Sequence, residues 1–524
     1  MEKRALIAIA LAFIILLVYQ FFFVKPEPQK VPKSLETERK APLPPPIKPA
    51  ETRKILPGTP SFEEKEIRVE TDLYLAVFTN KGGTLKYYEI KKYKDEFGKN
   101  VVLLHDSGNR HPLGIGPNYD FELAGSKFRV SEEDLILGKN QQSGSLVFEN
   151  TDSDLLIKRT YTFHNQSYRI DIKDEISGLP DYWITLGTDF GIHKKDTSVH
   201  IGPVILKDSD RIELDPRKLD QPRVYTGALR WIAQEDKYFF ASLVPVTEME
   251  EVRVWKQNGT ALMAFNGKPG INTFVLYAGP KEYDSLKALN VGLEHVVDFG
   301  FFSIIAVPLF WVLKFFYTII GNYGWAIVLL TLIIRIPFIP LINKSQRSMK
   351  KMQELQPRMA ELREKYKKDP QRLQREMMEL YKKYKVNPVG GCLPIILQIP
   401  IFFALYKILL IAIELRGAPF MLWINDLSAP DTLFGHIPAW FPLIGGFAVG
   451  PLPILMGITM IIQQKMTPTS MDPTQNKIMM LMPIIFTFLF LNFASGLVLY
   501  WLMNNVFSII QQFYANKKIA KESR

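Results

Sequence analysis

The chain has 524 residues, 47% of them hydrophobic, and carries 64 Lys and Arg against 53 Asp and Glu, which gives a net charge of +11. It is too long for one ordinary domain and too apolar in places for a purely soluble protein, so we expect several modules. The single cysteine, Cys392, excludes an intrachain disulfide, and the seven histidines show no metal-ligand spacing. We therefore expect no bound metal and no cofactor.

The N-terminal segment 1–24 predicts a membrane anchor. Lys3 and Arg4 precede about twenty uncharged, mostly apolar residues, which is enough to cross ~30 Å of hydrocarbon. Bulky residues end this run, so a retained signal anchor is favoured over a cleaved signal peptide, which would need small residues before its cleavage site. Residues 25–60 hold ten of the 36 prolines and almost no large apolar side chains, which predicts an extended linker.

Residues 61–290 predict a large, mainly antiparallel all-β domain. Apolar and charged residues alternate from Ile67 to Leu73, which is the two-residue period of half-buried strands. The alternation recurs in LLIKRTYTFHNQSYRIDI and in VRVWKQNGTALMAF, where Asn258-Gly259 suits a two-residue hairpin turn. This domain would lie outside the cytoplasm if the first segment is an anchor. A helix is predicted after it, over EYDSLKALNVGLEHV.

The C-terminal part predicts an α-helical polytopic membrane domain. A run at 299–316, interrupted by Pro308 and Lys314, is interpreted as an interfacial helix, because counting it as a span would place basic segments outside the cytoplasm. Six spans with both termini in the cytoplasm follow. The expected order is connecting and interfacial helices at 291–318, a five-span core at 319–516 with spans at about 320–342, 391–415, 443–464, 477–493 and 496–515, and a basic tail at 517–524.

The segment 345–386 predicts an antiparallel helical hairpin on the cytoplasmic side. Apolar residues recur every three or four positions on both sides of Asp369-Pro370, a pair that suits the start of the second helix. Fourteen basic and six acidic residues lie between 343 and 390. The hairpin is either a solvated connector or a docking surface for ribosomal RNA, anionic lipid or a targeting receptor. The candidate docking residues of hairpin and tail are Lys350, Lys351, Arg358, Arg363, Lys367, Lys368, Lys382, Lys383, Lys517 and Lys518.

Arg335 interrupts the apolar run TLIIRIPFIP, ~12 Å from the predicted cytoplasmic end of its span. Gln398 falls at nearly the same depth on the next span, and Thr331 lies one turn above Arg335. Asn504 and Asn505 on the last span are at similar or slightly deeper levels. These polar residues form the candidate site.

The predicted spans contain no carboxylate at the depth of Arg335, since Glu414 lies at the opposite end of its span. An unpaired guanidinium in hydrocarbon costs roughly 2.5–3.5 kcal/mol, so we expect Arg335 to face a hydrated cavity open toward the cytoplasm. A clamp that binds carbonyls and hydroxyls of neighbouring helices is the structural alternative. A proton or ion relay is the third interpretation.

Three apolar stretches resemble one known family. KVNPVGGCLPIILQIPIFFALY, PLPILMGITMIIQQKMTP and SGLVLYWLMNNVFSIIQQ, with the arginine of TLIIR and the charged hairpin, closely resemble the YidC/Oxa/Alb insertase family of bacteria, mitochondria and chloroplasts. The resemblance covers about 299–515 in order. A large exported domain after the first span is similar to the Gram-negative type, which implies a super-sandwich fold for the β domain.

The resemblance implies a hydrophilic groove, open to the cytoplasm and to lipid, that contains Arg335, Gln398 and Thr331. Trp501 stands where a second tyrosine is expected, so an apolar role is implied there. The implied partners are nascent membrane proteins, the lipid bilayer, the ribosome, a targeting receptor, and the Sec translocon with its accessory subunits. The slide along which a client helix passes would include Ile399, Phe402, Tyr500 and Trp501.

We interpret the chain as a membrane-protein insertase and folding chaperone of the inner membrane, with its large domain in the periplasm and no catalytic residue. It would insert nascent proteins alone or with the Sec translocon. A small-solute or anion transporter that uses Arg335 is the alternative, although the spans show no two-half repeat. A sugar-handling enzyme on the β domain is a third possibility, but no pairing of His with a carboxylate emerges.

Overall fold

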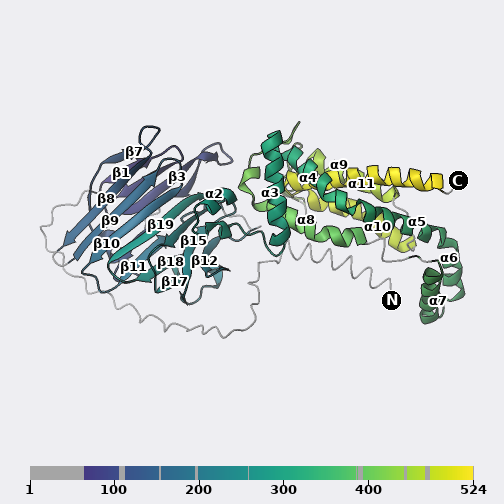
Figure 1. Ribbon diagram of the computed structural model, residues 1–524, viewed down its shortest axis with the longest axis horizontal. Coiled ribbons are helices and arrows are strands. Elements are labelled where there is room, and N and C mark those ends of the chain that lie inside the picture. Colours follow the sequence, from purple (N-terminus) through teal and green to yellow (C-terminus); the bar gives the residue numbers. More distant parts are fainter. Residues whose placement is uncertain are drawn as a thin grey trace. The chain divides into compact units, whose positions relative to one another are not determined.

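The computed structural model describes residues 64–105, 112–152, 155–194, 199–257, 259–384, 386, 393–441, 445–466 and 473–522 (Figure 1). The predicted anchor 1–24 and linker 25–60 lie outside the described residues. The described residues divide into a β unit that ends at Val297 and a helical unit that begins at Asp298.

The β unit contains three sheets, and every strand pair in them is antiparallel except β1 with β7. One sheet of five strands has the order β4 (Asn100–Leu104), β3 (Thr84–Lys94), β2 (Tyr74–Thr79), β1 (Glu66–Glu70) and β7 (Asp134–Ile136). The nine-stranded sheet has the order β13 (Asp210–Glu213), β12 (Gly202–Lys207), β15 (Leu229–Glu235), β16 (Phe239–Pro245), β19 (Ile271–Pro280), β10 (Arg169–Ser177), β9 (Leu155–His164), β8 (Ser143–Asp152) and β6 (Arg129–Val130). The other five-stranded sheet has the order β14 (Arg223–Thr226), β17 (Glu251–Gln257), β18 (Thr260–Gly267), β11 (Tyr182–Gly187) and β5 (Ile115–Gly116).

The nine-stranded sheet packs one face against both five-stranded sheets. Phe78 of β2 contacts the rings of Tyr161 and Phe163 on β9, with centroids 4.8 and 5.6 Å apart. From the third sheet, the Tyr182 hydroxyl donates to Asp174 of β10 over 2.6 Å. Large aromatic side chains fill the space between the layers, where they are removed from water. The predicted all-β domain is therefore confirmed, and its layers form a sandwich.

A buried ion pair lies inside this sandwich. Arg159 and Asp174 are opposite each other on β9 and β10, both fully buried, and two N–H groups of the guanidinium donate to the two carboxylate oxygens over 2.6 Å each. Tyr161 also accepts from Arg159 over 3.2 Å. A bidentate pair with further hydrogen bonds offsets the desolvation of two charges, which a single unpaired charge could not do.

Local sequence patterns explain most strand boundaries. Ile67 and Val69 are buried on β1 as the alternation predicts, but the strand ends at Glu70 rather than continuing to Leu73. The Thr71 hydroxyl accepts from the backbone N–H groups of Leu73 and Tyr74 and so closes a turn, which the period of two cannot show. The predicted hairpin between β17 and β18 has Gln257 opposite Thr260, in agreement with a two-residue turn, although Asn258 lies outside the described residues.

The helix predicted after the β strands is two short pieces. These are α2 (Tyr283–Ala288) and the 3-10 turn η3 (Leu293–Val296). Asn290 and Gly292 between them have φ of 57° and 77°, in the left-handed region that a continuous helix excludes. The apolar spacing alone did not reveal this break.

The helical unit begins with α3 (Ser303–Ile320) and α4 (Tyr323–Arg335), which is followed by the 3-10 turn η4 (Ile336–Phe338). It continues with α5 (Ile339–Glu354), α6 (Gln356–Lys365), α7 (Pro370–Lys383), α8 (Leu393–Ile411), the 3-10 turn η6 (Ile413–Leu415), α9 (Pro451–Met466), α10 (Pro473–Phe490) and α11 (Ser495–Glu522). By length and composition, Ser303–Ile320 and Tyr323–Glu354 could cross a membrane, and Gln398–Ile411 and Met479–Phe490 are shorter apolar helices. The count of six spans therefore stays a prediction.

The courses of α5 and α3 bear on the predicted spans. Helix α5 continues to Glu354, well past the predicted span end near Asn343. Helix α3 runs across the direction of α4, α9 and α11 in Figure 1. Because α3 could also span by length and composition, its interfacial position stays a prediction.

Candidate functional site

Arg335 is the last residue of α4, at a local change in helix geometry. The 3-10 turn that follows contains Pro337, which has no backbone N–H to donate. The Ile336 N–H instead donates to Ile333, three residues back, so the backbone tightens where Arg335 leaves it. Sequence placed Arg335 within a continuous span, whereas the structure places it at a junction between two helices.

The guanidinium of Arg335 is held by α11. Its Nη1 donates to the backbone carbonyl and to the side-chain oxygen of Asn504 over 2.9 and 3.0 Å. Its Nε and Nη2 both donate to Oε1 of Gln511, over 3.3 and 3.1 Å. The Gln511 amide group donates in turn to Asn343 Oδ1 over 2.9 Å and to the Ile339 carbonyl over 3.4 Å. Arg335 is thus coordinated by neutral oxygens from one neighbouring helix.

Within the described part of the chain, Arg335 forms no ion pair with a carboxylate. The geometry matches the clamp that the sequence left open as an alternative, with amide and carbonyl acceptors in place of hydroxyls. Neutral acceptors solvate the guanidinium but leave its charge uncompensated. A site of this kind can accept an anionic group from outside.

Gln398 of α8 contacts α11 one helical turn before the residue of α11 that binds Arg335. Its side-chain amide donates to the Tyr500 hydroxyl over 3.4 Å, and Tyr500 lies four residues before Asn504. Tyr500, Asn504 and Gln511 therefore follow one face of α11 at helical spacing. The structure brings Arg335 and Gln398 to the same helix face without a direct hydrogen bond between them.

Two predicted site residues make their bonds elsewhere. The Thr331 hydroxyl is buried and donates to the Ile327 carbonyl of its own helix over 2.7 Å. Asn505 is buried and donates to Thr459 over 3.2 Å, toward α9. The depth of both residues in the membrane stays a prediction, and the rotation of each helix against its neighbours depends on packing that the sequence does not display.

Aromatic side chains from three helices meet beside this polar face. The ring of Trp501 lies edge-on to Phe402 of α8, with centroids 5.0 Å apart, and also contacts Phe486 and Phe490 of α10 at 5.9 and 5.3 Å. The predicted apolar residues Phe402 and Trp501 are thus in contact, while Ile399 is half-buried on α8. The rings of Phe402, Phe486 and Phe490 are buried, and Trp501 is the half-buried member of this aromatic cluster.

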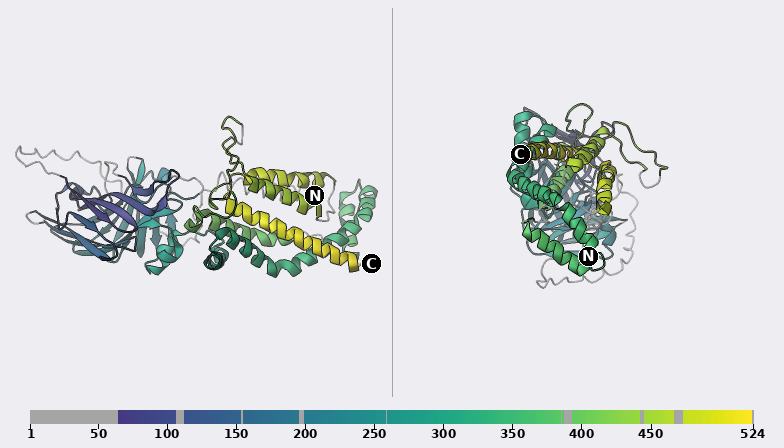
Figure 2. Two further views of the ribbon diagram at one scale, coloured as in Figure 1. Left: turned by 90° about the horizontal axis from the view of Figure 1, so that it is seen from above. Right: turned by 90° about the vertical axis from the view of Figure 1, so that its right-hand side faces the viewer.

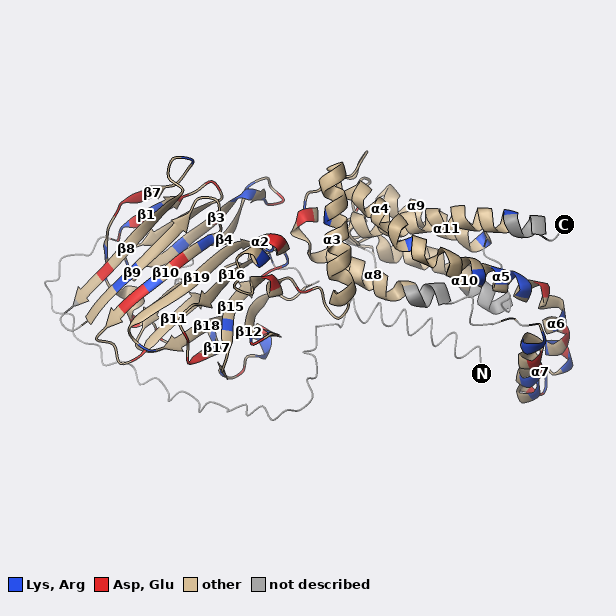
Figure 3. Cartoon of the chain, in the orientation of Figure 1, with Lys and Arg blue, Asp and Glu red and all other residues tan. Residues whose placement is uncertain are grey.

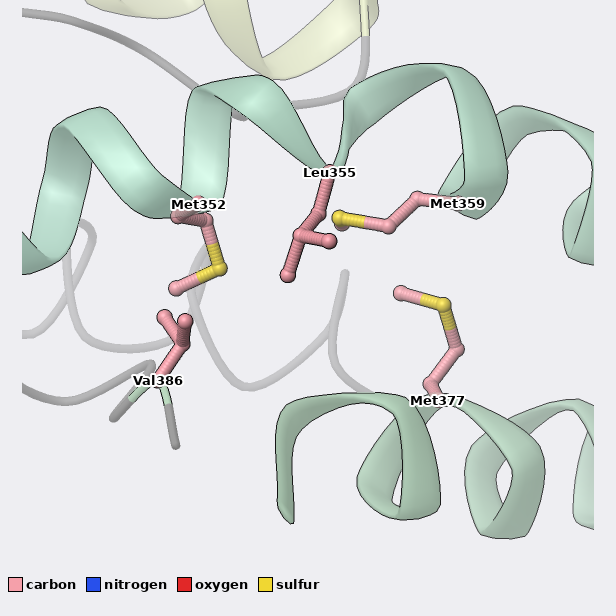
Figure 4. Packing of buried hydrophobic residues seen from close by; sticks show 5 residues of the cluster. All are labelled: Met352, Leu355, Met359, Met377 and Val386. Atoms are coloured by element: carbon pink, nitrogen blue, oxygen red, sulfur yellow. The ribbon is translucent and has the colours of Figure 1, made fainter. Parts of the chain in front are cut away.

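The hairpin predicted over 345–386, which contains the end of α5 with α6 and α7, has the predicted apolar seam. Met352, Leu355, Met359, Met377 and Val386 form one buried cluster, and Figure 4 shows the side chains of Met359 and Met377 pointing toward each other from facing helices. Asp369 caps α7 by accepting from the Arg372 N–H over 3.0 Å, with Pro370 in the first turn. Both the seam and the cap are confirmed.

The outer surface of the hairpin is charged. Figure 3 shows basic and acidic residues mixed along α6 and α7. Lys350 and Arg363 are half-buried, and the guanidinium of Arg358 lies 5.0 Å from the centre of the Tyr384 ring, while the side chain of Lys518 lies outside the described residues. The exposed candidate docking residues are Lys351, Arg358, Lys367, Lys368, Lys382, Lys383 and Lys517.

Gln511 is the site residue that sequence reasoning missed. It lies seven residues after Asn504, close to two helical turns, so it shares the Asn504 face. This spacing was the available signal. It was overlooked because Gln511 lies near the predicted end of the last span, where a polar residue needs no special explanation.

Two family models match the chain in tandem. Residues 66–312 match the YidC periplasmic domain, and residues 315–522 match the 60Kd inner membrane protein family. The first range covers the β unit and the second covers most of the helical unit. An inner-membrane protein with a large all-β periplasmic domain follows from these two matches.

Curated relatives extend over nearly the whole chain. A protein of Syntrophus aciditrophicus named membrane protein insertase YidC is 40% identical and covers 99% of this chain and 100% of its own length. A protein of the same name from Citrifermentans bemidjiense is 38% identical over the same shares. A crystal structure of an active YidC insertase with its first transmembrane domain resolved is 20% identical, covers 98% of this chain and 100% of its own, and has a TM-score of 0.39. By the identity and coverage of these relatives, the chain belongs to the YidC family of membrane protein insertases.

Proposed function

We propose that this chain inserts nascent proteins into the inner membrane through a hydrophilic groove around Arg335, without covalent chemistry. The observation that carries this proposal is a guanidinium whose hydrogen bonds, among the described residues, all go to neutral oxygens of Asn504 and Gln511. A client carboxylate or backbone carbonyl that reaches Arg335 can replace one of these acceptors and form a charge-assisted hydrogen bond. The family assignment favours this function over the transporter and sugar-enzyme alternatives.

The apolar part of a client would leave beside the polar part. Trp501 of α11 is half-buried and rests on Phe402, Phe486 and Phe490, which are buried on α8 and α10, so Trp501 would be the apolar surface that a client meets beside Gln398. A helix that slides along this surface exchanges one apolar contact for another, at little change in free energy. Hydrogen-bonding groups nearby shorten the dry distance that its polar flank must cross.

The membrane topology in this proposal has six spans with both termini in the cytoplasm. The crosswise course of α3 supports an interfacial helix rather than a seventh span, because an interfacial helix lies in the membrane plane (Figure 1). The hairpin of α6 and α7 would then face the cytoplasm. Its exposed basic residues suit the ribosome or a targeting receptor, and the Sec translocon is a further proposed partner.

Insertion of a short single-span client into reconstituted vesicles tests the groove. Arg335→Ala should lower the inserted fraction of a client whose translocated segment carries carboxylates. Lys407→Ala is the matched control, because Lys407 is a cation on the apolar helix α8 but is paired with Asp298 over 3.2 Å. Unchanged insertion by Arg335→Ala, in protein that remains folded, would refute the role of Arg335.

A further inference from the structure

The connection between α8 and α9 carries an apolar arm, defined here as residues 433–441 and 445–450. The Phe434 N–H donates to the Val449 carbonyl, and the Ile437 N–H donates to the Phe447 carbonyl, each over 2.8 Å. A return bond runs from the Val449 N–H to the Gly435 carbonyl over 2.9 Å. The two sides of the arm are therefore paired along their backbones like a short hairpin.

The base of the arm is fixed to the helical unit by a buried carboxylate. Asp431 accepts from the Trp423 indole over 3.1 Å and from the backbone N–H of Leu452, in the first turn of α9, over 2.8 Å. Any side chain at Gly450 would overlap Asp431, because a Cβ there would lie 2.0 Å from its carboxyl carbon. The Ala448 N–H also donates to Asn492 over 3.0 Å. These bonds fix the direction in which the arm leaves the helical unit.

Large apolar side chains on the arm are exposed. The side chain of Trp440 is 79% exposed, and no Asp, Glu, Lys or Arg occurs from residue 433 to residue 450. An exposed apolar patch of this kind, without charges, normally marks a site of contact with a membrane or a partner. The exposed apolar residues of the arm are Leu433, Phe434, Trp440 and Phe441.

The position of the arm favours lipid. Figure 2 shows the connection between α8 and α9 projecting sideways from the helices, near the end of the unit where α9 begins. The arm leads directly into α9, whose Ile454, Leu455 and Ile458 are also exposed and apolar. In a protein of the inner membrane, an apolar helix face exposed in this way contacts acyl chains. The arm continues that surface sideways, and its residues from 433 to 450 include no Asp, Glu, Lys or Arg.

We propose that the arm lies in the interfacial layer of the bilayer at the α9 end of the helical unit, with Trp440 at the boundary between headgroups and acyl chains. Tryptophan prefers this depth because its ring is apolar and its indole N–H can bind a headgroup or water. An anchor beside the helix ends would oppose tilting of α9 and α8 during insertion. This inference concerns a surface distant in sequence from Arg335 and does not depend on the groove.

Quenching of a fluorophore at Trp440 tests the proposal in the full chain. Cys392→Ser removes the only native cysteine, and Trp440→Cys provides a site for an environment-sensitive label in vesicles of phosphatidylethanolamine and phosphatidylglycerol. Lipids with a doxyl group near the headgroup should quench this label more than lipids with a deep doxyl group, because interfacial segments sit ~5–10 Å below the surface. Iodide, which stays in the water, should quench the label at Trp440→Cys about fivefold less than a label at Phe97→Cys, because lipid shields the interfacial site.

Phe97 is a matched control because it is also 79% exposed, on the turn between β3 and β4. Phe434→Cys repeats the measurement on the arm if Trp440→Cys fails to fold. Equal iodide quenching at Trp440 and Phe97 would overturn the proposal, since it would show the arm in water. Protection from both iodide and doxyl lipids would also overturn it, in favour of a protein contact.

Discussion

Arg335 directs two of its N–H groups to the single side-chain oxygen of Gln511, across 176 residues of sequence. The amide nitrogen of Gln511 donates to Asn343 and Ile339 at the same time, so the glutamine cannot turn its oxygen away without losing those bonds. Gln511 is therefore an oriented but neutral partner. It keeps the guanidinium in place without neutralising its charge, and in the proposed function that charge is available to a client.

Gln511→Glu should lower insertion toward the level of Arg335→Ala. The carboxylate would add the attraction of an opposite charge to the hydrogen bonds that the guanidinium already donates to Gln511, and so would give Arg335 a permanent ionic partner. A client would then compete about tenfold less well for the guanidinium, since each ~1.4 kcal/mol changes an equilibrium constant tenfold. The measurement is the inserted fraction of a client in reconstituted vesicles.

Gln511→Ala is the control for this charge effect, because it removes the bonds of the glutamine without adding a carboxylate. Insertion by Gln511→Ala should stay closer to that of the unmodified chain than insertion by Gln511→Glu. Equal loss in both variants would show that Gln511 is needed only to hold α5 and α11 together, and would remove the argument for an exchangeable partner.

Site-specific photo-crosslinking should distinguish two adjacent residues of α11. Tyr500 is 2% exposed and accepts from Gln398, whereas Trp501 is half-buried within the aromatic surface. A crosslinker at Trp501 or Gln398 should capture a stalled nascent chain, and one at Tyr500 should capture much less because neighbouring helices cover it. Gel analysis of the adducts measures this. Stronger capture from Tyr500 than from Trp501 would contradict the proposed exit surface.

Features that depend on neighbouring residues were predicted well from the sequence. The seam of the hairpin and the Asp369 cap are set within a few helical turns, so their spacing is visible in the chain. The alternation at Ile67 and Val69 identified a strand for the same reason. The β unit could therefore be predicted as antiparallel, although the order of its nine-stranded sheet could not, because that order depends on contacts between distant segments.

The candidate site was predicted in part. The depth of Arg335 and Gln398 follows from the rise of a helix, and both residues reach the same face of α11. The hydrogen-bond partners of Thr331 and Asn505 depend on how each helix is rotated in the unit. The hydrogen bond from Arg335 to Gln511 joins helices that are far apart in the sequence. Rotation of this kind is fixed by packing and not by the period of one helix.

The two adjacent methionines of α7 should differ in their effect on the hairpin. Met377 is 9% exposed and belongs to the buried cluster with Met359, whereas Met378 is 45% exposed. Met377→Ala should destabilise the hairpin by about 2 kcal/mol, at the low end for a buried methionine because the cluster is small, and Met378→Ala should have little effect. Hydrogen exchange of amides in α6 and α7 measures both. Equal protection in the two variants would show that the seam does not hold the helices together.

The buried carboxylate of Glu235 should make the stability of the β unit depend on acid pH. Glu235 is 2% exposed and forms ion pairs with Arg211 and with Lys281, the latter over 2.9 Å. Burial by itself raises the pKa of Glu235, but the charges of Arg211 and Lys281 outweigh it, so the pKa lies below its usual value of 4.5. The charged form is therefore favoured in the folded state. Its contribution is fully present above pH 4.5 and is lost as the pH falls through the lowered pKa.

Glu235→Gln removes this dependence while keeping the shape of the side chain. At neutral pH the variant should lose about 3–5 kcal/mol of unfolding free energy, because Lys281 would remain buried without its carboxylate, whereas Arg211 keeps its ion pair with Glu213. The difference from the unmodified chain should narrow as the pH falls below the pKa of Glu235. Thermal unfolding of the full chain, followed through its tryptophan fluorescence, measures the loss of stability and its dependence on pH.

Glu133→Gln is the control, since Glu133 forms an exposed ion pair with Lys65 that contributes about 0–1 kcal/mol. A constant difference between Glu235→Gln and the unmodified chain at every pH would show that Glu235 does not carry the charge assigned to it.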